Sequence, residues 1–300
     1  MKKIASLIAA FVLLFTLTAC GEEEKTTLVV GLLQLEQASE ADLIAYDAAL
    51  ERLTTALAEA TGLEVELYEA GDYAIGVTAL AEGNVDILYL SPFTYYNATQ
   101  QADVEPLVTT SGDFSARPYN TIFITKSDRN DINSLEDLEG KSFAFVDPAS
   151  SSGFLYPSYD LVSELNLDRD RYMESGYFFD STVYSGGHTN SLVGVLNENF
   201  DAAAVAHALV DFIPVVAPEY QISDLKIIHQ TDVIPNPFYI ISTDMDPVLK
   251  ETLLNFYLFW DDADYFEQVY GDPETRYVLV NMDEVNTVLD VVETLGVEAD

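Results

Sequence analysis

Apolar positions along the chain follow two periods, one typical of strands and one typical of helices. Residues 26–33, 63–70 and 85–90 are short apolar or alternating runs, the pattern of buried or half-buried strands. Residues 42–62 and 72–84 lie between these runs and carry apolar side chains at helical spacing. Strands that alternate with helices in this way predict a βαβαβ unit on a largely parallel sheet.

A second unit of the same kind follows in the middle of the chain. Its expected strands and helices, in chain order, are 141–146, 152–166, 172–179, 189–200 and 201–206. Asp86 and Asp201 occupy matching joints in the two units, each between a helix end and an apolar strand, which indicates a structural role for both carboxylates. The chain is therefore expected to be an α/β protein with two lobes.

Two extended segments connect the units and indicate a paired hinge. They lie around residues 105–128 and 225–242. We expect the first lobe to comprise residues 28–115 plus 240–300 and the second lobe residues 116–239, with the C-terminal helices packed on the first lobe. A cleft between such lobes is the expected ligand site, and closure about a few hinge residues is a recognised mode of capture.

The first residues have the layout of an export signal. Two lysines precede an apolar run that ends at Leu17 and is shorter than the roughly 20 residues that a bilayer span requires. The following Thr-Ala-Cys completes a bacterial lipoprotein box, so we expect a signal peptide over 1–19, a lipid on Cys20 and a tether over 20–27. Cys20 is the only cysteine, which excludes a disulfide framework. The protein should be exported and held by its lipid on the outer face of the bacterial cytoplasmic membrane or in the periplasm.

The charge of the chain excludes one class of partner. It contains 51 acidic and 13 basic residues, for a formal net charge of -38. Nucleic-acid binding needs clustered Lys and Arg, whereas the basic residues here are few and scattered. Surface acidity of this degree serves solubility, and screening over roughly 8 Å at physiological salt confines its repulsion of an anion to nearby charges.

The segment Asp147-Pro-Ala-Ser-Ser-Ser-Gly153 marks the start of a helix directly after an apolar strand. A helix start exposes unpaired N–H groups and the positive end of the peptide dipoles, so it can hold an anion. Serine is also a preferred N-cap residue, and a cap is the competing interpretation. Three consecutive serines before a glycine, which lets backbone approach a guest closely, make the two interpretations about equally strong.

These motifs resemble those of the phosphate/phosphite/phosphonate-binding family, the type II periplasmic binding proteins of ABC importers. Residues 147–153, which we call the serine turn, match the family's Asp-Pro-x-Ser-(Thr/Ser)-Ser-Gly element. Ser185-Gly-Gly-His188 matches its Ser-Gly-x-His element. The strand at 85–90 with its Pro-x-x-Tyr turn is also similar. The resemblance covers about residues 28–242. It implies two α/β lobes joined by a two-strand hinge, with the cleft between them.

The resemblance also implies the ligand contacts. The family's phosphoryl contacts fall on Ser150, Ser151, Ser152, Gly153 and His188. The family's first-lobe aromatic falls on Tyr95, and its contact in the crossing segment falls on Thr121. We also expect Tyr46 to reach the cleft from the first helix. Family members that hold aminoalkyl phosphonates use carboxylates that are absent at the matching segments here, "AVAHAL" and "IPNPFY". This departure favours phosphite, methylphosphonate or phosphate.

The sequence thus predicts a monomeric solute-binding lipoprotein that captures a phosphorus oxyanion and delivers it to an ABC permease and its ATPase, without a cofactor. A ligand-sensing receptor subunit for a small anion is an alternative. A hydrolase built on Ser152, His188 and Asp201 is a weaker one, because no Gly-x-Ser-x-Gly elbow occurs. No metal site is expected, because the histidines are widely spaced and no Cys pair occurs.

Overall fold

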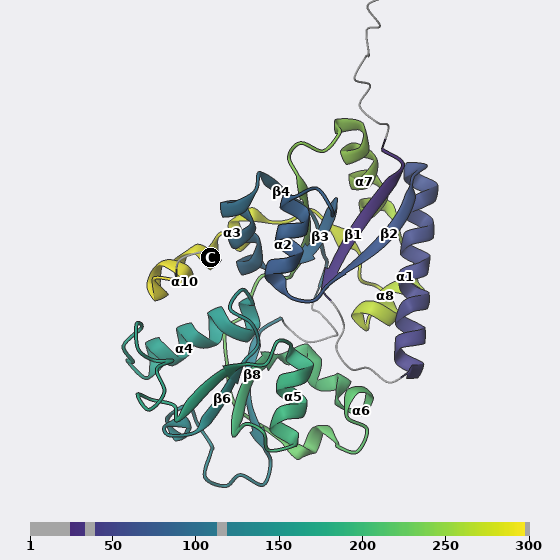
Figure 1. Ribbon diagram of the computed structural model, residues 1–300. Helices are drawn as coiled ribbons and strands as arrows, with labels where there is room; N and C mark the ends of the chain where they lie inside the picture. Colours follow the sequence, from purple (N-terminus) through teal and green to yellow (C-terminus); the bar gives the residue numbers. More distant parts are fainter. Residues whose placement is uncertain (1–24, 34–39, 113–118, 298–300) are drawn as a thin grey trace, which may run out of the picture.

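The structure, a computed structural model, describes residues 25–33, 40–112 and 119–297 and has two lobes, each built on one mixed sheet (Figure 1). The sheet of the first lobe has the order β11 (Tyr277–Val278), β4 (Val104–Thr110), β10 (Phe238–Ser242), β3 (Ile87–Leu90), β1 (Thr27–Leu33) and β2 (Glu64–Ala70). The sheet of the second lobe has the order β7 (Ser181–Tyr184), β6 (Ser142–Phe145), β8 (Ala202–Ala206), β5 (Thr121–Lys126) and β9 (Leu225–Gln230).

The two sheets share one plan. In each sheet, three neighbouring strands are parallel and the next strand is antiparallel to them. In the first lobe, the parallel strands are β2, β1 and β3, and β10 is antiparallel. In the second lobe, the parallel strands are β7, β6 and β8, and β5 is antiparallel. The antiparallel strand is the one that enters from the other lobe, because the chain crosses between β4 and β5 and returns between β9 and β10. The α/β class with two lobes is therefore confirmed.

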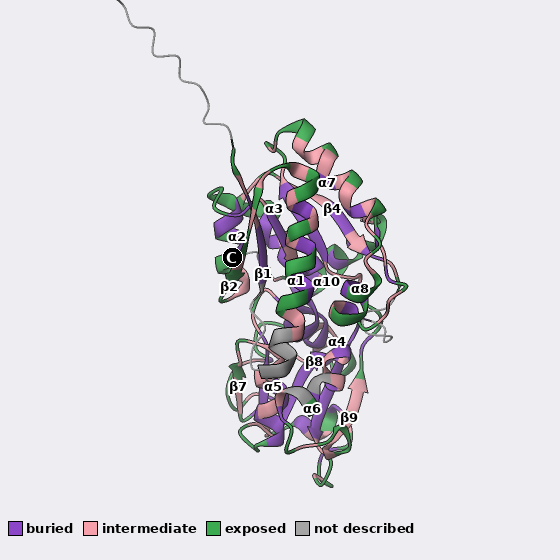
Figure 2. Ribbon diagram, turned by 90° about the vertical axis from the view of Figure 1, so that its right-hand side faces the viewer, coloured by how far each residue is buried: buried purple, intermediate pink, exposed green. Residues whose placement is uncertain are grey.

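Helices cover both faces of each sheet. Those of the first lobe are α1 (Glu40–Thr61), α2 (Tyr73–Ala81), α3 (Pro92–Gln101), α7 (Pro247–Phe259), α8 (Ala263–Tyr270) and α9 (Met282–Val285). Those of the second lobe are α4 (Tyr156–Glu164), α5 (His188–Leu196) and α6 (Ile213–Val216), and the final helix α10 (Thr287–Leu295) contacts both lobes. Buried residues gather on the strands, while the outward faces of the helices are exposed (Figure 2). Within the described residues, no helix is both long and apolar enough to cross a membrane.

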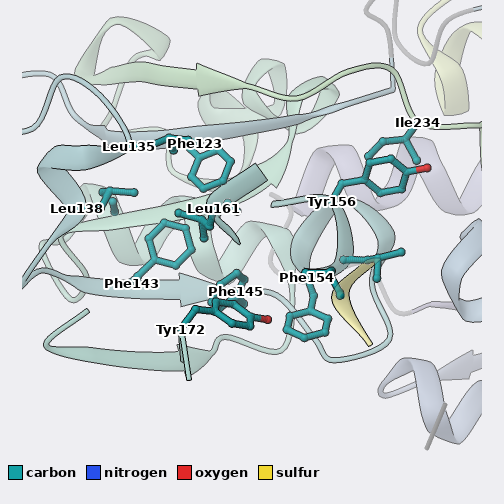
Figure 3. Packing of buried hydrophobic residues seen from close by; sticks show 14 of the residues in the cluster. Phe123, Leu135, Leu138, Phe143, Phe145, Phe154, Tyr156, Leu161, Tyr172 and Ile234 are labelled. Carbon is teal, nitrogen blue, oxygen red and sulfur yellow. The ribbon is translucent and has the colours of Figure 1, made fainter. Parts of the chain in front are cut away.

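The largest apolar cluster lies in the second lobe and is rich in aromatic side chains. Phe143 and Phe145 on β6 pack against Phe179 with ring centroids 4.9 and 6.4 Å away, and Leu161 of α4 belongs to the same cluster (Figure 3). The expected strand at 172–179 is wrong, since this segment consists of turns and the strand β7 comes directly after it. Its aromatic residues suggested a strand, but they anchor an irregular segment in the core.

We expected both C-terminal helices to pack on the first lobe, and α10 contacts both α3 of that lobe and α4 of the second. Val288, Val292 and Leu295 belong to the large apolar cluster, which also includes Phe93 of α3. These positions form one apolar stripe at helical spacing, which needs a partner but does not specify which lobe supplies it. The end of the chain thus ties the two lobes together beside the crossing strands.

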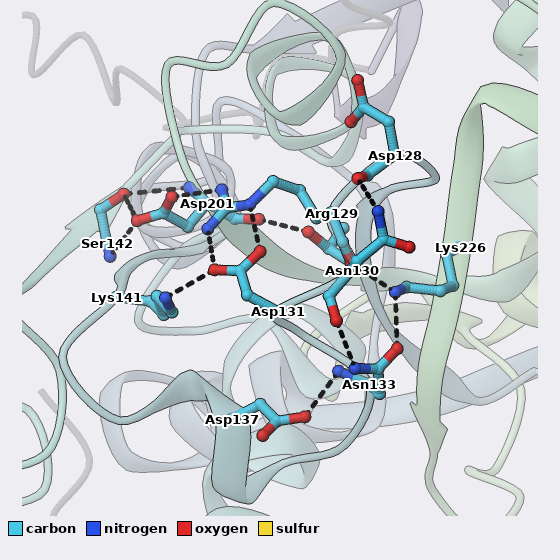
Figure 4. Close-up of polar contacts among 11 residues, drawn as sticks. Asp128, Arg129, Asn130, Asp131, Asn133, Asp137, Lys141, Ser142, Asp201 and Lys226 are labelled. Carbon is cyan, nitrogen blue, oxygen red and sulfur yellow. Dashed lines mark hydrogen bonds and ion pairs between the residues drawn. The ribbon is translucent and has the colours of Figure 1, made fainter.

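Asp86 and Asp201 have the structural roles that their matching positions predicted. The Asp86 carboxylate accepts a hydrogen bond from the N–H of Val29 at 2.8 Å and so joins the start of β3 to β1. Asp201 accepts from the N–H of Ser142 at 2.8 Å and from Arg129, and joins β8 to β6 (Figure 4). Burial would raise the pKa of Asp201, but these hydrogen bonds outweigh burial and lower the pKa.

Candidate ligand-binding site

The serine turn lies between β6 and α4 and faces the first lobe. Ser150 has an extended backbone, and its hydroxyl accepts a hydrogen bond from the N–H of Gly153 at 3.0 Å, so it is an N-cap. A single wide turn, η3 (Ser151–Leu155), follows, in which the N–H of Leu155 donates to the carbonyl of Ser150. The cap interpretation is therefore right for Ser150.

The absence of a side chain at Gly153 lets the serine turn approach the end of strand β6 closely. A Cβ atom at this position would lie 2.3 Å from the Cβ atom of Val146, and the carbonyl of Gly153 accepts a hydrogen bond from the N–H of Val146 at 2.9 Å. We expected Gly153 to let the backbone approach a ligand. In the structure, it lets the serine turn pack on the end of β6.

Ser151 joins the two lobes directly. Its hydroxyl donates to the hydroxyl of Ser91 at 3.0 Å and accepts from the N–H of Phe93 at 2.9 Å. Ser91 is the N-cap of α3, where it also accepts from the N–H of Thr94. Ser91 was not among the residues expected at the site. Its position before the Pro-x-x-Tyr turn marks it as a cap, but nothing local indicates that a capping hydroxyl contacts the other lobe.

Ser152 lies between a tyrosine and a histidine. Its hydroxyl is 3.0 Å from the hydroxyl of Tyr119 and 3.5 Å from Nε2 of His188. Ser152 itself is fully buried. Burial raises the pKa of Tyr119 well above its usual range, so this phenol keeps its proton. A hydroxyl, a phenol and an imidazole thus converge on one point without any charged group.

The hydrogen bonds of His188 fix its tautomer. His188 begins α5, and its Nδ1 accepts a hydrogen bond from the N–H of Ala206 at 3.1 Å. Because Nδ1 is an acceptor, the proton of the neutral ring is on Nε2, which points toward Ser152 as a donor. The residue as a whole is only half-buried, yet burial of the imidazole lowers its pKa from 6.5 to about 4. At neutral pH, His188 is an uncharged donor.

A cavity of about 150 Å³ opens between the lobes at this point. The described residues that line it are Tyr73, Tyr89, Leu90, Ser91, Tyr119, His188, Ala206, Ala208, Leu209 and Pro237. Its polar lining consists of hydroxyls and the imidazole, and its remaining walls are apolar. The three consecutive serines do not line it, because they lie behind Ser91, Tyr119 and His188, to which Ser151 and Ser152 are hydrogen-bonded.

Two other openings suit an anion less well. One of about 310 Å³ lies beside the serine turn and is lined by Asp72 and Asp147, and burial raises the pKa of Asp147. Another of about 850 Å³ is lined by Lys25, Asp86 and Asp244 and includes none of the expected ligand contacts. Carboxylates in both linings repel an anion, whereas the described lining of the 150 Å³ cavity has none.

The remaining expected contacts do not line the 150 Å³ cavity. The hydroxyl of Thr121 donates to the carbonyl of Ser152 at 2.7 Å and thereby supports the serine turn. Tyr95 packs edge-on against Phe238, with ring centroids 5.2 Å apart. Tyr46 packs on the core of the first lobe, where burial raises its pKa. Cys20 lies outside the described residues.

The chain is similar to known substrate-binding proteins. Residues 40–285 match the sequence model of a family described as "ABC transporter, phosphonate, periplasmic substrate-binding protein". The "Phosphate-import protein PhnD" of Mycolicibacterium smegmatis is 29% identical over 264 residues, which cover 84% of this chain and 79% of the relative. The "Phosphonates-binding periplasmic protein" of Escherichia coli is 28% identical, with 86% and 74% covered. The structure of PhnD1 from Prochlorococcus marinus in complex with methylphosphonate superposes with a TM-score of 0.74 at 16% identity, covering 90% and 98% of the two chains.

Proposed function

Because this chain belongs to the family of phosphonate-binding periplasmic components of ABC transporters, we propose that it captures a small phosphorus oxyanion between its lobes and delivers it to a permease. One observation carries the proposal. The Ser152 and Tyr119 hydroxyls and the protonated Nε2 of His188 converge beside an interlobe cavity of about 150 Å³. Hydrogen bonds to a charged acceptor contribute about 1.5 to 3 kcal/mol each, so neutral donors suffice to hold an anion.

The ligand enters by exchanging hydrogen bonds. An oxygen atom that accepts from two donors at ordinary distances needs these donors about 4.5 Å apart. Ser152 and Tyr119 are 3.0 Å apart, and Ser152 and His188 are 3.5 Å apart. The phosphoryl oxygens therefore replace the contacts among these three side chains, and this replacement brings Ser152 to the cavity. Opening of the lobes, which breaks the bond between Ser91 and Ser151, gives access to it.

The cavity wall favours a ligand whose substituent is small and uncharged. Ala206, Ala208, Leu209 and Pro237 form its apolar side, and no acidic residue lines it within the described part of the chain. An alkylammonium group would be buried there without a carboxylate partner, which is costly. This supports phosphite, methylphosphonate or phosphate over aminoethylphosphonate, as the "AVAHAL" segment also indicates.

The geometry argues against a serine hydrolase. A general base must accept the serine proton on Nε2, while Nδ1–H donates to an orienting carboxylate. In His188 these roles are reversed, since Nδ1 accepts from Ala206 and Nε2 carries the proton. Asp201 bonds to Ser142 and Arg129 instead. We infer that the chain carries its ligand without changing it.

The proposed location is the outer face of the cytoplasmic membrane or the periplasm. The family is periplasmic, which supports export. The lipoprotein box supports an acyl anchor on Cys20 as a finer proposal, and mass spectrometry of the N-terminal peptide tests it. A sensing role differs from transport in its partner, and ligand-dependent stimulation of a permease ATPase in proteoliposomes distinguishes the two.

Isothermal titration calorimetry tests the ligand class. The purified full chain in mild detergent is titrated with phosphite, methylphosphonate, phosphate and aminoethylphosphonate, and methanesulfonate serves as a control of similar size. We expect at least one of the first three to bind at micromolar or lower concentration and aminoethylphosphonate to bind at least about tenfold more weakly. Absence of binding by all the phosphorus oxyanions would contradict the proposal.

A further inference from the structure

A second cluster of polar side chains lies in the second lobe, away from the interlobe cavity. His229 is on β9, and Asp160 and Glu164 are one turn apart on α4; the hydrogen bond between His229 and Asp160 joins the two elements. Nε2 of His229 is 2.7 Å from Oδ2 of Asp160 and 3.7 Å from Oε1 of Glu164. The three potential ligand atoms all lie within 4.8 Å of one another. One imidazole and two carboxylates thus face a common point.

The negative charge of this cluster exceeds what its own residues neutralise. Among the described residues, the ion pairs of Asp160 and Glu164 are those with His229. Two carboxylates therefore share one imidazole that carries at most a single positive charge.

The ligand set and its geometry suit a divalent transition metal. Imidazole nitrogen and carboxylate oxygen bind Zn²⁺ at about 2.0–2.2 Å, so two ligands of a tetrahedral ion lie about 3.4 Å apart. The distance between His229 and Glu164 is already near this value. The hydrogen bond between His229 and Asp160 must lengthen by about 0.7 Å, which a small side-chain rotation provides. The imidazole favours Zn²⁺-class ions over Mg²⁺ or Ca²⁺, which prefer oxygen ligands alone.

We propose that Asp160, Glu164 and His229 bind one divalent transition-metal ion of the Zn²⁺ class on the surface of the second lobe. Asp160 and His229 are 14% and 20% exposed, and Glu164 is 55% exposed, so the site is open to solvent on the Glu164 side for entry and for a water ligand. His229 and Asp160 are 69 positions apart in the chain, so no ligand spacing in the sequence indicates the site.

A metal ion at this site would link two elements that lie next to the ligand site and the hinge. α4 begins directly after the serine turn, and β9 leads into the second crossing between the lobes. A metal ion held by both elements cross-links them. The ion therefore stabilises the second lobe next to the hinge without contacting the oxyanion.

Metal binding to the full chain tests the proposal. The chelator-stripped protein is titrated with Co²⁺ and Zn²⁺ in high salt with excess Mg²⁺, which suppresses binding to scattered surface carboxylates. We expect one equivalent of Zn²⁺ by calorimetry, visible Co²⁺ bands indicative of nitrogen and oxygen ligands, and displacement of Co²⁺ by Zn²⁺. His229→Gln and Glu164→Gln should each weaken Zn²⁺ binding by more than about tenfold.

A matched pair of variants controls for charge. Asp160→Asn and Asp170→Asn each remove one carboxylate from the second lobe, but Asp170 is 87% exposed and lies outside the cluster. We expect loss of Zn²⁺ affinity in the first variant alone. Equal affinity in wild type and His229→Gln, or weak binding of several ions that Mg²⁺ abolishes, would overturn the proposal. Glu164 is exposed enough that its variant folds, so the test does not depend on the more buried residues.

Discussion

The Ser152→Ala variant tests whether the serine turn binds the ligand or only caps a helix. The substitution removes the hydroxyl that lies 3.0 Å from Tyr119 and 3.5 Å from His188. It leaves the backbone of the turn in place, because the cap is made by Ser150. The variant therefore separates ligand contact from helix capping at adjacent positions.

The expected loss of affinity follows from comparing two hydrogen bonds of Ser152, one to a charged ligand oxygen in the complex and one to the neutral Tyr119 hydroxyl in the free protein. In the complex, Ser152 donates to a charged oxygen, and losing such a bond costs about 1.5 to 3 kcal/mol. The free variant also loses the neutral bond between Ser152 and Tyr119, which lowers its free energy of unfolding by about 0.5 to 1 kcal/mol. Affinity should fall by the difference, about 1 to 2 kcal/mol or about 5- to 30-fold. We expect both effects in Ser152→Ala.

Ser158→Ala is the matched control. Ser158 is also a fully buried serine, and its hydroxyl accepts from the hydroxyl of Tyr172 at 2.9 Å. It lies on α4 and does not line the cavity. The control should therefore lose similar stability in urea unfolding but keep its affinity for methylphosphonate by calorimetry. If Ser152→Ala binds within about threefold of wild type, the serine turn does not hold the anion and the reasoning fails.

Three further variants test the fold around the site. In Gly153→Ala, the new Cβ clashes with Val146, and we expect about 1 to 3 kcal/mol less stability in urea together with weaker ligand binding; wild-type stability would contradict the packing argument. In Asp201→Asn, weaker bonding to Ser142 should cost about 1 to 3 kcal/mol of stability and leave ligand affinity unchanged, whereas a loss of affinity in the folded variant would reopen the catalytic alternative. Because folding lowers the pKa of His188 from 6.5 to about 4, wild type should lose up to about 3 kcal/mol of stability relative to His188→Gln as the pH falls between these values; parallel stability curves would refute the shift.

Patterns local to the sequence predicted most of the fold. Strand and helix periods gave the two βαβαβ units, and the matching joints gave the roles of Asp86 and Asp201. The errors occurred where contacts distant in sequence decide the structure. Residues 172–179 have the aromatic composition of a strand but are held as turns by the core. The apolar stripe on α10 predicts a buried face, but it does not indicate that this face contacts helices of both lobes.

The candidate ligand-binding site could likewise be predicted only in part. The serine turn and His188 are recognisable because their neighbours along the chain mark helix starts. Ser91 and Tyr119 complete the arrangement from other segments, 60 and 33 positions away from their serine partners. Tyr119 precedes a crossing strand, where an aromatic residue is equally typical of ordinary packing. No local pattern distinguishes a tyrosine that only packs from one whose hydroxyl hydrogen-bonds to a serine beside the cavity.

A site made of neutral donors suits an acidic chain that must release its ligand. The donors at the cavity already hydrogen-bond one another, so the ligand gains only the difference between a charge-assisted bond and the neutral bond that it replaces. Each exchange contributes modestly, and affinity grows with the number of exchanges rather than with one strong ion pair. When the lobes reopen, the hydroxyls recover their mutual partners, which lowers the cost of release. A buried lysine in the same place would bind more tightly, but it would remain as an unpaired charge each time the ligand left.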